Sequence, residues 1–180
     1  MATTKIRTTH GIQYLLFIFS LLVFNTTQGQ QGKGYAVHAN IIYHFTKYID
    51  WPDDMKSGDF IIGIIGDAPL YDELKKVTDN KTVGRQKIVI RQFKSYTSAT
   101  QCHILFIPDE EIGQLKKIVG ITTGKPVLLV TETEGAGHKG SCINFVVIDD
   151  RLRLEFNKSN VEKRDLHIAT ELLQLGSVIK

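Results

Sequence analysis

The chain has 180 residues, of which 22 are Lys or Arg and 19 are Asp or Glu, for a formal net charge of +3 at pH 7. Lys5 and Arg7 lie in a leader-like start, so the rest of the chain carries 20 − 19 = +1. This near-neutral balance gives no electrostatic case for nucleic-acid binding, which needs a clustered basic stripe. About 150 residues remain after the leader, enough for one domain with a substantial core and too few for two.

Residues 1–29 have the pattern of a secretory signal peptide. Lys5 and Arg7 precede an apolar run from Ile12 to Phe24, and small and polar residues follow. This run is shorter than the roughly 20 apolar residues that cross a bilayer, so we expect cleavage near Gly29 rather than anchoring. The mature chain is then residues 30–180, exported and without a membrane span.

The segment from Tyr35 to Pro52, YAVHANIIYHFTKYIDWP, is predicted as a helix with two apolar faces. Helical spacing places on one face Tyr35, His38, Ile42, Phe45 and Ile49. It places on the second face Val37, Ile41, His44 and Tyr48. We expect the first face to cover a sheet and the second either to be packed inside the domain or to form an exposed interaction patch. Pro52 is expected to end the helix.

Short apolar runs follow, of the kind found in strands covered on both faces of a parallel sheet. They span residues 60–67, 87–93, 103–109 and 126–132. Helices are predicted between them at 69–79, where Pro69 suits a first helical position, and at 109–120, where acids begin the segment and Gly120 ends it. Strands that alternate with helices predict an α/β domain.

The pattern changes at Cys142. The segments CINFVVI and RLRLEFN, joined by a turn at Asp149 and Asp150, alternate apolar and polar residues and predict an antiparallel hairpin at a sheet edge. Residues 158–180 are predicted to be helical, with Ile168, Leu172, Leu175 and Ile179 on one face. The whole pattern predicts an α/β fold, a single three-layer domain with a mixed, mainly parallel central sheet, a C-terminal β-hairpin and helices on both faces.

Three segments invite a catalytic or nucleotide-binding interpretation. The run from Gly63 to Asp67 lacks the third glycine of a dinucleotide loop, and the run from Gly120 to Lys125 is one residue short of a Walker A loop. The loop from Glu132 to Ser141 brings His138 and Ser141 close in sequence, but it has no nucleophile-elbow motif. We therefore predict no catalytic or cofactor-binding residues and no enzyme activity.

Metal ligands are also missing from the pattern. His38 and His44 are six residues apart, which places them on different sides of a helix, and the chain has no CxxC or HExxH motif. No metal site is predicted.

The chain has two cysteines, Cys102 and Cys142, each just before a predicted strand. In an exported chain such a pair suggests a disulfide, which would close a loop of about 40 residues and stabilise the fold by roughly 4 kcal/mol. The bridge requires neighbouring strands, because the two Cα atoms must lie within about 7 Å. Two buried free thiols are the alternative.

In its order of motifs the sequence resembles the YfiR-like family of exported bacterial regulators. The matching motifs are NIIYHFTKYIDWP, IIGIIGDAPL, VGRQKIV, CHILFIPD, GKPVLLVTE, INFVVIDDRLRLEFN and IATELLQLGSV, which cover the chain from about Tyr35 to Val178. The resemblance implies a periplasmic regulator that is not an enzyme. Such proteins are often homodimers that repress a membrane-bound diguanylate cyclase by binding its periplasmic region, which lowers cyclic di-GMP and biofilm formation. Better-studied members carry additional cysteines in disulfides, which puts redox control in doubt for a chain with two.

A binding role fits the residues of the first helix. Aromatic and apolar anchors of the kind that dominate protein interfaces gather on it, so the predicted partner or dimer surface comprises Ile41, Tyr43, His44, Lys47, Tyr48 and Trp51. The alternative is a small-molecule binding protein. In that case the strand-end loops at Gly66–Asp67 and Glu132–Ser141 would form the cleft.

Overall fold

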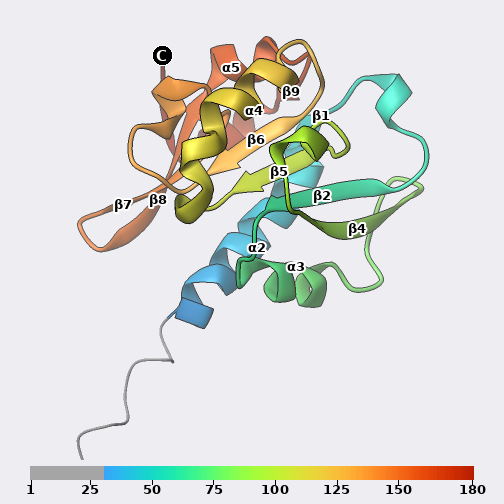
Figure 1. Cartoon of the computed structure of the whole chain (residues 1–180), viewed down its shortest axis with the longest axis horizontal. Helices are drawn as coiled ribbons and strands as arrows, with labels where there is room; N and C mark the ends of the chain where they lie inside the picture. The colour runs from blue at the N-terminus through green and yellow to red at the C-terminus, as the bar shows by residue number, and fades with distance from the viewer. Residues whose placement is uncertain (1–30) are drawn as a thin grey trace, which may run out of the picture. The chain divides into compact units, whose positions relative to one another are not determined.

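The computed structural model describes residues 31–180, of which Gly34–Lys180 form one compact unit (Figure 1). The expected signal peptide at residues 1–29 lies outside the described residues. Among the helices of residues 31–180, none combines the length and the apolar character needed to cross a membrane.

A mixed, mainly parallel sheet of eight strands forms the centre of this unit, in the order β10-β8-β7-β6-β5-β2-β4-β3. Its strands are β2 (Phe60–Ile65), β3 (Thr82–Val83), β4 (Gln86–Phe93), β5 (Ile104–Ile107), β6 (Leu128–Thr131), β7 (Ile143–Ile148), β8 (Arg151–Asn157) and β10 (Ser177–Ile179). The pairs β7–β8 and β3–β4 are antiparallel, and the remaining pairs of this sheet are parallel. The predicted fold class and the predicted hairpin are confirmed.

The central strands are apolar on both sides because helices cover both faces of the sheet. Every residue of β5 and β6 is buried. The remaining helical elements are α2 (Gln31–Tyr48), η1 (Asp53–Met55), α3 (Leu70–Thr78), η2 (Tyr96–Ser98), η3 (Asp109–Gln114), α4 (Leu115–Thr122), η4 (Ala136–Lys139), α5 (Lys158–Glu162) and α6 (Thr170–Leu173). The crossovers β2-α3-β4 and β5-α4-β6 run in opposite directions across the sheet. Since such crossovers are right-handed, α3 and α4 lie on opposite faces.

Helix α2 lies on the same face as α3. The ammonium group of Lys81, just after α3, lies 5.6 Å from the ring centre of Tyr43 in α2. Figure 1 shows α2 on the far side of the strands and α4 on the near side. The arrangement therefore has three layers.

The first helix ends earlier than predicted. It stops at Tyr48, and Ile49–Asp50 form β1, which pairs antiparallel with β9 (His167–Ile168). The carbonyl of Tyr48 accepts a hydrogen bond of 2.8 Å from the amide of Ala169. Pairing with the distant strand β9 therefore ends the helix before Pro52. The early end could not be predicted from the residues around Tyr48, because β9 lies far away in the sequence.

The prediction of one helix over residues 158–180 is wrong. This tail folds as α5, β9, α6 and β10, and Asp165 within it adopts a left-handed φ of 55°. Strand β10 pairs parallel with β8, so the hairpin does not lie at the edge of the sheet. A Cβ at Gly176 would lie 2.2 Å from the carbonyl oxygen of Leu154, so only glycine allows the tail to approach β8 this closely.

Candidate interaction surface

One face of α2 packs on the sheet as predicted. Ile42 and Phe45 are fully buried. The rings of Phe45 and His38 lie 6.3 Å and 4.2 Å from the ring of Phe145 in β7, measured between centroids. Aromatic packing therefore fixes the helix against the hairpin strand β7.

The second face of α2 remains open. Val37 is 49% exposed and Tyr48 is 37% exposed, whereas Ile41 is half-buried and packs against the core. His44, between them on this face, is exposed. The domain leaves part of this apolar face uncovered at Val37 and Tyr48, as an interaction patch requires.

A groove runs beside this face, between α2, β8 and α6. Its volume is about 190 Å³, and it is lined by Ile41, His44, Leu152, Arg153, Leu154, Leu172 and Leu175. Leu175 is 64% exposed. The groove and the open face of α2 together form the interaction surface, defined by Val37, Ile41, His44, Tyr48, Leu152, Leu172 and Leu175.

The floor of the groove follows from strand register. Leu154 pairs with Phe145 and Leu152 pairs with Val147 across the β7–β8 ladder. Directly paired residues in antiparallel strands point to the same face, and Phe145 contacts α2, so both leucines face the helix. Val147, which is 71% exposed, extends this apolar face toward the tip of the hairpin.

Of the six residues predicted for the surface, five lie on α2 and form two groups. Ile41 and His44 line the groove, and Tyr48 lies on the open face beside it. Tyr43 is half-buried, and the ammonium group of Lys47 lies 4.8 Å from its ring centre, so this pair sits on the flank of the helix.

Trp51 has to be removed from the predicted surface. It is only 5% exposed, and its ring packs edge-on against Phe60 at 5.0 Å. The chain leaves the helix at Tyr48, and β1 directs Trp51 into the core. Trp51 was predicted on the helix surface because the helix was expected to continue to Pro52.

The start of α2 is held by a carboxylate that sequence analysis did not single out for this role. The hydroxyl of Tyr35 donates a 2.8 Å hydrogen bond to Glu132, and His38 Nε2 lies 3.7 Å from the same carboxylate. The backbone amide of Asp109 also donates to it. Burial raises the pKa of the Glu132 carboxyl, and burial together with the Glu132 contact raises the pKa of Tyr35.

The contact between Glu132 and α2 occupies part of the region where a small-molecule cleft was predicted as the alternative to a protein-binding surface. Glu132 is engaged by α2, while Asp67 accepts a hydrogen bond of 3.1 Å from Gln92. At the other end of the glycine loop, a Cβ on Gly137 would lie 2.4 Å from Ile179. The loop is therefore packed against the C-terminal strand.

His138 and Ser141 have separate surroundings. Ser141 is fully buried, and its hydroxyl contacts Thr131 and donates to the carbonyl of Ile143. His138 is exposed, and its Nδ1 bonds to the carbonyl of Lys180. Within residues 31–180 these side chains form no nucleophile and base pair. No three His, Cys, Asp or Glu side chains of this range gather to hold a metal ion.

The predicted disulfide between Cys102 and Cys142 is absent. Both are buried free thiols, bonded to the carbonyls of Ala99 and Asn160 respectively. They precede β5 and β7, and β6 lies between these strands. Two strand spacings amount to about 9.5 Å, beyond the reach of a disulfide. Burial raises the pKa of both thiols and keeps them protonated.

The fold and this surface define a class: an α/β protein with a preformed apolar groove beside its leading helix. The sequence matches the YfiR/HmsC-like family over residues 35–177, which includes every strand from β1 to β9. The chain belongs to this family, whose members are periplasmic regulators. A search of curated proteins finds no match to the chain.

Proposed function

We propose that this protein is an exported periplasmic regulator that acts by binding another protein through the interaction surface. The observation that carries the proposal is the open apolar face of α2, where Val37 and Tyr48 remain exposed beside a groove lined with leucines. Burying Val37 and Tyr48 against a partner would contribute about 25 cal/mol per Å² of apolar area.

The composition of the surface fits a protein partner. Tyr48 supplies an aromatic anchor with a polar tip, and His44 supplies a polar group at the groove. Interfaces concentrate their binding energy in a few such anchors around an apolar centre. The floor and most of the walls belong to α2, β8 and α6, so little ordering of these elements is needed on binding.

The proposed partner is the periplasmic region of a membrane-bound diguanylate cyclase. Family membership supports this choice, because the family consists of periplasmic regulators. Binding would repress the cyclase, lower cyclic di-GMP and reduce biofilm formation. We also propose that the protein forms a homodimer.

The test uses two charge substitutions in the interaction surface, Ile41→Asp and Tyr48→Asp. Binding to the purified periplasmic region of a membrane-bound diguanylate cyclase from the same organism is measured by calorimetry, and mass is measured by light scattering. We expect each substitution to weaken binding at least tenfold, about 1.4 kcal/mol, because a carboxylate would be buried without a partner.

The matched control is Ile148→Asp. Ile148 is 52% exposed, and it follows Val147 in β7, so its side chain points to the face opposite the groove. This variant should bind as the unmodified chain does. Unchanged binding and unchanged mass in both surface variants, with native circular dichroism, would contradict the proposed surface. Loss of dimer mass alone would assign the surface to self-association and remove it from partner binding.

A further inference from the structure

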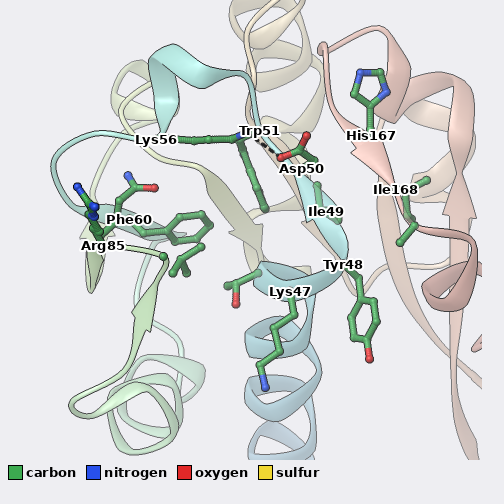
Figure 2. A pocket seen from close by; sticks show the side chains of 15 residues that line it. Lys47, Tyr48, Ile49, Asp50, Trp51, Lys56, Phe60, Arg85, His167 and Ile168 are labelled. Atoms are coloured by element: carbon green, nitrogen blue, oxygen red, sulfur yellow. Dashed lines mark ion pairs between the residues drawn. The ribbon is translucent and has the colours of Figure 1, made fainter.

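A second cavity adjoins the interaction surface at Tyr48, which is one of its lining residues. Its volume is about 590 Å³, within the range of small-molecule sites, and its walls come from the end of α2, the β1–β9 ribbon and the β3–β4 hairpin. Figure 2 shows Trp51 and Phe60 in its middle, with Arg85 to one side and His167 and Ile168 to the other. No residue lines both this cavity and the groove beside α2.

The walls of the cavity are held without a ligand. The carbonyl of Met55 is bonded by Gln86 Nε2 and by His103 Nε2, each at 2.9 Å. Gln86 also donates to the carbonyl of Ser57 at 3.2 Å. These bonds tie the loop that carries Lys56 to the first residue of β4. A site with fixed walls loses little free energy to ordering when it binds.

The floor of the cavity contains two buried aromatic residues, Trp51 and Phe60, which are 5% and 1% exposed. The rings of Trp51 and Phe60 meet edge-on at 5.0 Å, and Phe60 stacks on His103 at 4.3 Å. Trp51 Nε1 is buried, and it has no hydrogen-bond acceptor among the described residues. A buried indole N–H normally has an acceptor, so this residue of the cavity floor carries an unsatisfied donor.

The rim of the cavity carries more positive than negative charge. Its cations are Lys47, Lys56 and Arg85, and its carboxylate is Asp50. The ammonium group of Lys56 lies 3.1 Å from Asp50 and 3.0 Å from Asp53, so its charge is largely matched.

The two remaining rim cations, Lys47 and Arg85, differ in their surroundings. The ammonium group of Lys47 lies over the ring of Tyr43. Arg85 has no ion-pair partner among the described residues, and it follows Gly84, whose left-handed φ of 57° makes the tight turn between β3 and β4. The turn thus presents one unmatched guanidinium group at the rim, and guanidinium binds carboxylate through two parallel hydrogen bonds.

We propose that this cavity binds a small organic acid as its monoanion. The apolar body, aromatic or branched, lies against Trp51 and Phe60, and the carboxylate bonds to Arg85. Arg85 is the one guanidinium group among the lining residues, and its two parallel hydrogen bonds suit a single carboxylate. The assignment is independent of the proposed regulatory role.

The experiment uses 3-phenylpropanoate as the probe and 3-phenylpropanamide as its neutral counterpart. Trp51 is the only tryptophan of the chain, so its emission on excitation at about 295 nm reports this cavity alone. We expect a saturable change in emission with the acid, and at least tenfold weaker binding of the amide. Calorimetry gives the stoichiometry, with one site per chain expected.

Three arginine variants assign the charge. Arg85→Gln should weaken binding of the acid at least tenfold and leave binding of the amide unchanged. Arg85→Lys should retain part of the affinity for the acid. Arg151→Gln is the matched control, because Arg151 is also exposed but lies at the hairpin turn. Native circular dichroism verifies the fold of each variant.

Three results would overturn the assignment. The first is the absence of a saturable change with the acid in the unmodified chain. The second is equal affinity for acid and amide. The third is an equal loss in Arg85→Gln and Arg151→Gln. The binding of a protein partner is judged separately by Ile41→Asp, because Ile41 lines the groove beside α2 and the groove shares no lining residue with this cavity.

Discussion

Burial shifts the pKa values of both His103 and Glu132, and the two shifts have opposite effects on stability at low pH. Burial lowers the pKa of His103, whose Nδ1 accepts from the amide of Ile61 while Nε2 bonds to the carbonyl of Met55. This pattern requires neutral imidazole with its proton on Nε2. Burial raises the pKa of Glu132. Acidification therefore destabilises the protein through His103 and stabilises it through Glu132.

His103→Gln is expected to reduce the loss of stability on acidification from about pH 7 to about pH 5. The unfolded chain binds a proton at His103 below its ordinary pKa of about 6.5, whereas the folded chain resists it, so stability falls as pH drops through that range. We expect the acid-induced loss to shrink by about 1 kcal/mol or less, since partial solvent screening limits the effect. Urea unfolding of both proteins at both pH values measures it.

Glu132 is present in both proteins of this comparison, so its opposing contribution cancels. The same loss of stability in the variant as in the unmodified chain would show that His103 binds a proton as readily in the folded state as in the unfolded state. The roles of His103 and Glu132 were not predicted from the sequence. The partners of His103, for example, are Ile61 and Met55, which come from a distant strand and loop.

At the scale of elements, α2 is held by its ends and by its buried face. Tyr35 contacts Glu132 at the start, and the carbonyl of Tyr48 bonds to Ala169 at the end. Between them Phe45 is fully buried against Phe145. The helix is thus fixed on the sheet while its outer face stays free for the proposed contacts.

Phe45→Ala is expected to destabilise the protein by about 3–5 kcal/mol, because it leaves a cavity under the helix. Val37→Ala is the matched control on the open face of the same helix and should change stability by no more than about 0.5 kcal/mol. Urea unfolding measures both. A cost for Val37→Ala as large as that for Phe45→Ala would show that the outer face is buried in solution, by a second copy of the chain or otherwise.

Periodicity predicted α2, α3 and the central strands because their patterns follow directly from which side is buried. It failed for the tail, where Ile168, Leu172, Leu175 and Ile179 recur at helical spacing but belong to four different segments or their links. Leu172 packs in the core, while Ile179 lies in β10 beside β8. Tertiary pairing overrode a short and weak helical pattern.

At the scale of the whole molecule, the last residues close one side of the sheet. Strand β10 pairs with β8 through Ser177–Ile179 and covers the edge that the hairpin would otherwise expose. The carbonyl of Lys180 contacts His138, which joins the C-terminus to the glycine loop. Open sheet edges are sites of self-association, so this short strand protects the domain.

Removal of residues 177–180 is expected to lower the thermal midpoint and to promote self-association through the uncovered edge of β8. Removal of Lys180 alone keeps β10 and is the control. Thermal unfolding and size-exclusion chromatography at several protein concentrations measure the two effects. An unchanged midpoint and an unchanged elution volume for the longer deletion would show that β10 does not stabilise the sheet.

The amino-acid pattern by itself determined the α/β class, the buried central strands, the β7–β8 hairpin and the amphipathic first helix, since each follows from which residues are apolar over a short stretch of chain. Tertiary structure alone decided the separation of Cys102 from Cys142 by β6, the turn of Trp51 into the core and the cavity beside it. Those features depend on which distant segments become neighbours, and sequence spacing carries no direct record of that choice.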